Sequence, residues 1–167
     1  LAEQVDGLRE AGEMKRSAER SAKLAKAQQA ALEKKLEPIR AKLKQGDKEY
    51  SKAVSQSKNT SASAKACESA VSSYKSGWKS AQELANASPD DAALQGEVAE
   101  LSDQLVDSAL RAALHAANVL TLQTDYKGAT EWVNRILKFD PDNEAAKEML
   151  ETIQIAQAES GDRDDYR

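Results

Sequence analysis

The stretch Ala109–Asn143, ALRAALHAANVLTLQTDYKGATEWVNRILKFDPDN, decides the fold of this 167-residue chain. Small apolar residues such as Ala113 and Ala117 line its first half. A polar corner at 124–125 follows, and a second amphipathic run ends just before Pro141. Apolar residues that recur every three or four positions on both sides of a short corner predict two antiparallel helices.

Composition extends this interpretation to the whole chain. Only 7 glycines and 3 prolines interrupt a sequence dominated by Ala, Ser, Glu, Lys and Gln. Such residues are mostly good helix formers, so we expect an all-α protein. Because much of the apolar surface is alanine, the predicted core is thin and elongated.

Two long stripes at heptad spacing precede the deciding stretch. The first runs through Ala18, Ala22, Ala25, Gln29, Leu32, Leu36, Ile39 and Leu43, and the second runs from Tyr50 to Ala85. Heptad spacing lets one helix face meet a partner helix continuously. With a turn at 45–47, the stripes predict helices over 1–44 and 48–87 that form a long antiparallel coiled-coil hairpin. A helix break within 57–63 is the alternative, because Asn, Ser and Thr compete for backbone hydrogen bonds.

Three parts of the chain are therefore expected. Residues 1–87 form the helical hairpin, in which Pro38 should kink the first helix or start a new one. Residues 88–158 form a short helical domain, with helices over about 88–123, 126–139 and 143–158, the first capped by Ser88 and Pro89. Residues 159–167 form a frayed polar tail.

The segment from about 109 to 158 resembles a tetratricopeptide repeat, a helix-turn-helix unit of about 34 residues that stacks on its neighbours. Ala117, Tyr126, Ala129 and Pro141 match the pattern of that family. The chain departs from it at three positions: Ala113 and Ala116 replace larger residues of the first helix, and Thr124 replaces the usual corner glycine.

The resemblance implies where a ligand would bind, because the first helix of each repeat lines the groove of that family. Carried over residue by residue, the partner-binding positions are Arg111, Leu114, Asn118 and Thr121. It also implies a TPR-like, non-catalytic module that binds a protein or peptide. The alternative is a structural or assembly protein, tethered to the cell envelope, that uses the hairpin as a spacer or homodimerisation arm.

Nothing in the sequence points to catalysis, a metal or a cofactor. His115 is the single histidine, and Cys67, the single cysteine, lies on an apolar stripe, as expected of a core residue. Trp78 and Trp132 are expected to be core anchors. No glycine-rich phosphate loop occurs.

Charge and hydropathy bear on partners and compartment. Residues 1–58 carry 14 basic and 9 acidic side chains, whereas residues 59–167 carry 10 and 19. The basic part has Tyr50 alone for base stacking, which disfavours nucleic-acid binding.

No apolar run approaches the ~20 residues that span a bilayer. Because the chain begins with Leu1, we expect a soluble fragment that is either cytoplasmic or extracytoplasmic, the latter after removal of an upstream signal peptide or anchor.

Overall fold

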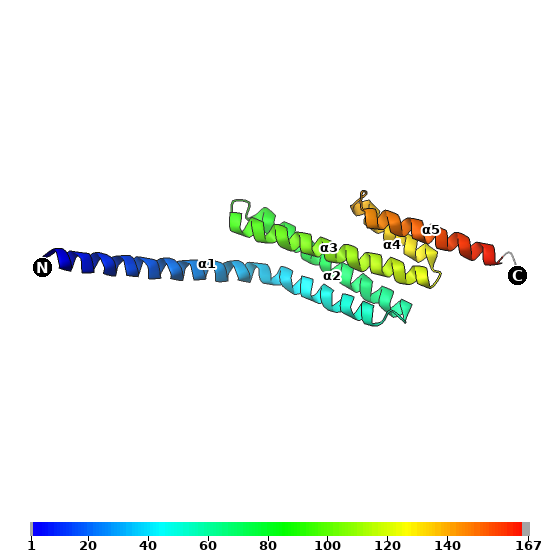
Figure 1. The fold of residues 1–167 in the computed structure, drawn as a ribbon, viewed down its shortest axis with the longest axis horizontal. Helices are drawn as coiled ribbons and strands as arrows, with labels where there is room; N and C mark the ends of the chain where they lie inside the picture. The colour runs from blue at the N-terminus through cyan, green and yellow to red at the C-terminus, as the bar shows by residue number, and fades with distance from the viewer. Residues whose placement is uncertain (1, 165–167) are drawn as a thin grey trace. The chain divides into compact units, whose positions relative to one another are not determined.

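The computed structural model describes residues 2–164, with side chains described at position 7 and at positions 9–161. These residues form the helices α1 (Ala2–Ser55), α2 (Thr60–Ala87), α3 (Ala92–Leu122), α4 (Tyr126–Phe139) and α5 (Glu144–Asp164), drawn in Figure 1. The predicted all-α class is confirmed.

Contacts divide the chain into two units, residues 1–37 and residues 38–167. The division falls at Pro38, which lies inside α1 and does not end it. In the first unit, the side chains of residues 13–31 are all exposed. The larger unit contains the rest of α1 and the other four helices, and the following paragraphs describe that unit alone.

The turn between the first two helices lies ten residues later than expected. Helix α1 continues through 45–47 to Ser55, and α2 begins at Thr60. The predictions of a turn at 45–47 and of one helix over 48–87 are therefore wrong. The break at 56–59 overlaps the alternative patch 57–63, and the Asn59 side chain accepts a hydrogen bond from the backbone N–H of Ala62 at 3.2 Å. An asparagine N-cap of this kind starts a helix.

Close packing against α2 explains why position 46 of α1 is a glycine. Gly46 is buried, and a Cβ atom added there would lie 2.3 Å from Cε1 of Tyr74 on α2. The glycine therefore provides the space that the tyrosine ring fills. The pairs Gly46–Tyr74 and Ala53–Ser63 both join α1 to α2, so the two helices are antiparallel neighbours over this part of α1.

The remaining boundaries agree with the sequence in part. Helix α4 has the predicted bounds, and Asp125 caps it by accepting from the N–H of Gly128 at 2.9 Å. Helix α3 is capped by Asp91 instead of Ser88, because the Asp91 carboxylate accepts from Leu94 N at 3.0 Å. Helix α5 extends through 159–164, which were expected to fray, and residues 165–167 lie outside the described residues.

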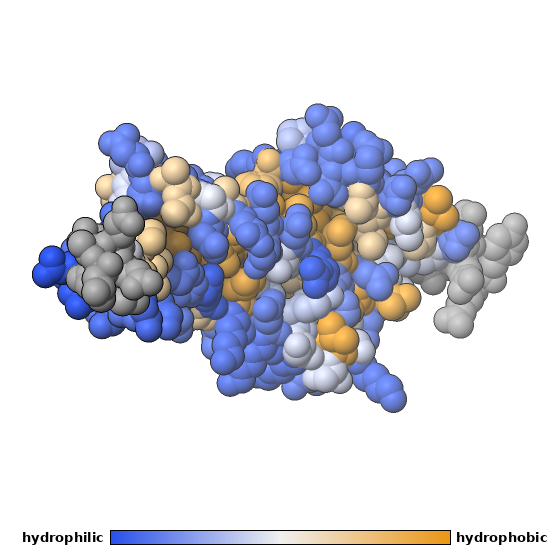
Figure 2. Space-filling model, turned by 60° about the vertical axis from the view of Figure 1, so that its left-hand side comes forward, coloured by the Kyte–Doolittle hydropathy of each residue, from blue (hydrophilic) through white to orange (hydrophobic). Residues whose placement is uncertain are grey.

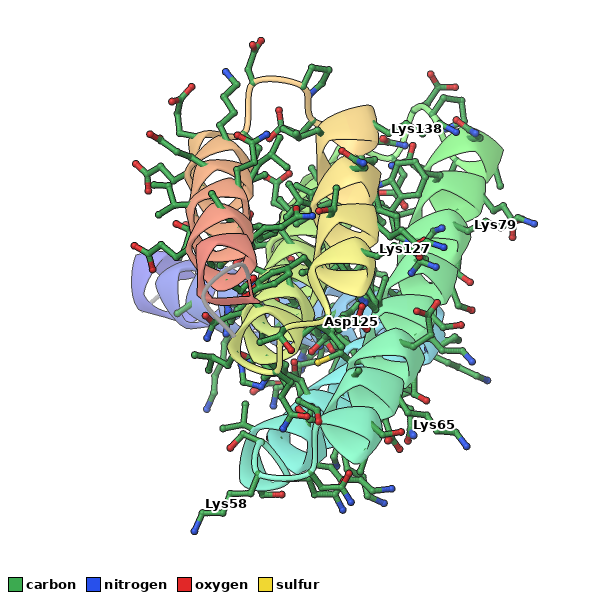
Figure 3. The ribbon with its side chains drawn as sticks, turned by 90° about the vertical axis from the view of Figure 1, so that its right-hand side faces the viewer. Lys58, Lys65, Lys79, Asp125, Lys127 and Lys138 are labelled. Carbon is green, nitrogen blue, oxygen red and sulfur yellow. The ribbon has the colours of Figure 1, made fainter. Side chains whose placement is uncertain are left out.

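The helices of the larger unit alternate between two layers. Figure 3 shows α2 and α4 on one side and α3 and α5 on the other, and both α2 and α4 pack against α3. The core between them is rich in alanine, which lets the helices approach closely. Its buried members are Ala53, Ala66, Cys67, Ala113, Ala116, Ala117, Ala129, Trp132, Val133, Ile136, Ala146 and Ile153.

The corner between α3 and α4 has the one positive φ among the described non-glycine residues. Thr124 adopts a φ of 62°, and the N–H of Asp125 donates to the carbonyl of Leu120 at 3.0 Å. A β-branched residue is strained in this region, which favours glycine. Thr124 thus occupies a conformation for which glycine is the ordinary residue.

Candidate functional site

The four predicted partner-binding residues differ in their surroundings on α3. Arg111 and Asn118 are exposed. Leu114 is half-buried and packs against the alanine-rich core, and the Thr121 hydroxyl donates to the carbonyl of Ala117 at 2.8 Å. Two of the four side chains are thus free of core packing and backbone bonding, and their role in binding stays a prediction.

Sequence reasoning missed a groove on the other layer of the stack. It lies between α2 and α4, with α3 as its floor, is open to solvent along one side and has a volume of about 740 Å³. Apolar side chains dominate the floor: Leu105, Val106, Ala109, Leu110 and Ala113. Figure 2 shows more generally that apolar residues reach the surface in hollows between hydrophilic side chains.

An aromatic pair bridges one end of this groove. Trp78 of α2 and Phe139 of α4 meet edge to face, with ring centroids 6.4 Å apart. Trp78 is 39% exposed and Phe139 is 58% exposed. The pair is thus held together at the surface rather than in the core. The prediction of two core tryptophans is confirmed for Trp132, which is 7% exposed, and wrong for Trp78.

An ion pair bridges the groove elsewhere along its length. Arg135 Nη1 of α4 donates to Glu68 Oε2 of α2 at 2.8 Å. The Arg135 guanidinium also lies over the Trp132 ring, 4.7 Å from its centroid. Because both partners of the ion pair are more than half exposed, the pair contributes only about 0–1 kcal/mol to stability. An incoming ligand could therefore exchange it at low cost.

The ionisable residues that line the groove are mostly basic. Lys75, Arg135 and Lys138 line it together with one acid, Glu68. In Figure 3, Lys127 and Lys138 lie on the side of α4 toward α2. The groove thus combines an apolar floor, two surface aromatic residues and a net positive lining.

In contrast to the open groove, the side of α2 that faces α1 is buried by helix packing. Tyr74 is 1% exposed, and its hydroxyl donates to Asp47 Oδ1 at 2.8 Å. Burial raises the pKa of the Tyr74 phenol well above its usual range, and the hydrogen bond to Asp47 adds to that rise. The charge of Arg111 opposes the rise in this pKa. The neutral phenol is therefore the form that the fold holds.

The remaining reactive side chains have structural surroundings. Burial raises the pKa of the Cys67 thiol from 9.0 to about 11, which keeps it protonated at neutral pH. His115 packs edge to face against Tyr50, with centroids 5.7 Å apart. Among the described residues, no group of three or more His, Cys, Asp or Glu side chains could hold a metal ion.

Comparison of this chain with family models, with curated proteins and with solved structures finds no match. The resemblance to tetratricopeptide repeats therefore stays a prediction. Within residues 2–164, none of the helices combines the length and the apolar character needed to cross a membrane.

Proposed function

We propose that this chain is a non-catalytic interaction module that binds a protein or peptide in the groove between α2 and α4. The observation that carries the proposal is the exposed Trp78–Phe139 pair at the edge of an apolar groove. Exposed apolar patches with polar rims mark interaction sites, and Trp and Arg are enriched among the residues that dominate binding energy.

The packing of α3 and α4 supports a TPR-like helical stack as the frame of this module. Ala117 and Ala129, which match the family at its close helix crossing, are both fully buried. The exposed Arg111 and Asn118 lie on α3, and neither of them lines the groove. The face of α3 that bears these two residues is therefore a second candidate surface for binding a protein or peptide.

Site-specific photo-crosslinking in cells that make the protein tests the proposal. A benzophenone amino acid at Ser72 places the reactive group in the lining of the groove. The same amino acid at Asn118 tests the α3 face, and at Thr152, an exposed position of α5, it provides the matched control. We expect a light-dependent adduct from position 72 and none from position 152.

Other patterns of crosslinking would move the binding site or contradict the proposal. An adduct from position 118 alone would move the binding site to the α3 face. Adducts of equal yield from all three positions, or from none of them, would contradict the proposal of a specific binding groove.

An assembly role is the second candidate, and the exposed side chains of residues 13–31 on α1 favour it. The heptad stripe through these residues would then meet the same stripe of a second chain. The mass of the protein in solution separates the two candidates. A dimer that becomes a monomer when Ala18 and Ala25 are changed to Lys supports assembly, whereas a monomeric wild type supports a module that acts alone.

A further inference from the structure

We propose that the occupant of the groove is an acidic amphipathic helix of about three turns. This inference rests on the proposed function and adds the chemistry of the partner. The groove has three features that together select such an occupant: its length, the absence of backbone partners in its lining, and its charge.

The length follows from the residues that line the two walls. The lining of α2 runs from Glu68 to Trp78, and that of α4 runs from Trp132 to Phe139. At 1.5 Å per residue these segments span about 15 Å and about 10 Å, the length of roughly two to three helical turns. Apolar side chains at positions i, i+3 or i+4, and i+7 of a helix would cover this length.

The backbone of the lining favours a helix over an extended peptide. All lining residues belong to the helices α2, α3 and α4, whose interior backbone groups are paired within each helix. An extended peptide would find no strand edge here with which to pair its own N–H and C=O groups, whereas a helix satisfies them internally. The small side chains of Ala109 and Ala113 leave depth in the floor for larger apolar side chains.

The charge of the groove lining favours a bound helix that has acidic residues on both sides of its apolar stripe. Lys75 and Lys138 are exposed on the two sides of the groove, and because the charges of Arg135 and Glu68 offset each other, the lining has a net charge of +2. The single lining acid, Glu68, already pairs with Arg135. A helix with carboxylates beside its apolar stripe would find complementary charge on both walls, which speeds and orients binding.

The tryptophans of the chain supply the readout for a test. The chain has two tryptophans, Trp78 and Trp132, and both line the groove, so all indole fluorescence reports on it. The probe is a tryptophan-free, end-capped helical peptide with Leu at i, i+3 and i+7 and Glu on the flanks. Its twin has Lys in place of each Glu. We expect a saturable change in emission with the acidic peptide and about tenfold weaker binding, or more, of the basic twin at low salt.

Charge reversal on the protein sharpens the test. In the variant Lys75→Glu/Lys138→Glu, we expect the preference to pass to the basic twin. The matched control is Lys52→Glu/Lys58→Glu, which makes the same change of net charge at exposed positions outside the groove and should keep the acidic preference. All four positions are exposed, so circular dichroism should show unchanged folding.

Several results would overturn the inference. They are equal binding of the two peptides, stronger binding of the basic twin to the wild type, or saturation by a small apolar dye while neither peptide binds. These outcomes differ from failure of the proposed function. An adduct from position 72 without an acidic preference would leave the module standing and remove only the chemistry assigned to its partner.

Discussion

Tyr74 and Trp78 stand one turn apart on α2, yet one is buried and the other is exposed. Gly46 of α1 leaves room for the ring of Tyr74, and Asp47 accepts a hydrogen bond from its hydroxyl. Trp78 meets Phe139, which is itself exposed. The difference shows that the neighbouring helix, and not the position on a heptad stripe, determines whether an aromatic side chain is buried or exposed.

Truncation of Tyr74 should have the largest effect on stability. Because the ring is fully buried, we expect Tyr74→Ala to lower the free energy of unfolding by about 3–5 kcal/mol. Tyr74→Phe removes only the hydroxyl that bonds to Asp47 and should cost about 1 kcal/mol. Urea unfolding of the three proteins measures both values. Equal effects of the two substitutions would contradict the packing role of the ring.

A methyl group at position 46 should also destabilise the protein, although alanine favours helices. The Cβ of Gly46→Ala would lie 2.3 Å from the Tyr74 ring, and overpacking of this kind costs about 1–3 kcal/mol. Gly96→Ala is the matched control, because nothing lies within 4 Å of its Cβ, and it should stabilise α3 by up to about 1 kcal/mol. In a Tyr74→Ala background the cost of Gly46→Ala should disappear, which a double-mutant cycle measures.

Alkaline pH should weaken the closed side of α2 through Tyr74. The folded state raises the pKa of this phenol above its ordinary value of 10.0, so it favours the neutral form. The resulting stabilisation is complete below that ordinary value and is lost as the pH rises above it. Between about pH 8 and about pH 11, the wild type should therefore lose more stability than Tyr74→Phe. Parallel loss in both proteins would show that the phenol does not contribute.

Removal of the Trp78 side chain should have the smallest effect on stability. The indole is partly exposed and its main aromatic contact is an edge-to-face pair, which contributes about 0.5–1.5 kcal/mol. We expect Trp78→Ala to destabilise the protein by about 1 kcal/mol. A loss as large as that of Tyr74→Ala would remove the contrast between the two residues and identify Trp78 as a core residue.

The sequence predicted the helical class and the bounds of α4, because those depend on local residue patterns. It placed the turn at 45–47 and offered a break near 56–59 only as the alternative within 57–63. Gly46-Asp47 has the local chemistry of a turn, but it lies inside α1, where Gly46 packs against Tyr74, 28 residues away. Local propensity could not reveal a contact that only tertiary packing creates.

The groove could not be predicted from the sequence for a related reason. Its walls come from residues near 68–78 and 132–139, which lie on one surface only after α3 has brought α2 and α4 together. The prediction from family resemblance pointed to α3, where Arg111 and Asn118 are exposed and Leu114 is half-buried against the core. The three aromatic residues Trp78, Trp132 and Phe139 were the available signal, and their convergence required the topology.

The affinity of the partner identified by crosslinking at position 72 tests the central claim most directly. We predict that Trp78→Ala weakens that binding by at least about 2 kcal/mol, roughly 30-fold, while Arg111→Ala/Asn118→Ala leaves it unchanged. The melting temperature of each variant should show that it remains folded. Binding of the partner to folded Trp78→Ala within about twofold of the wild type would contradict the account.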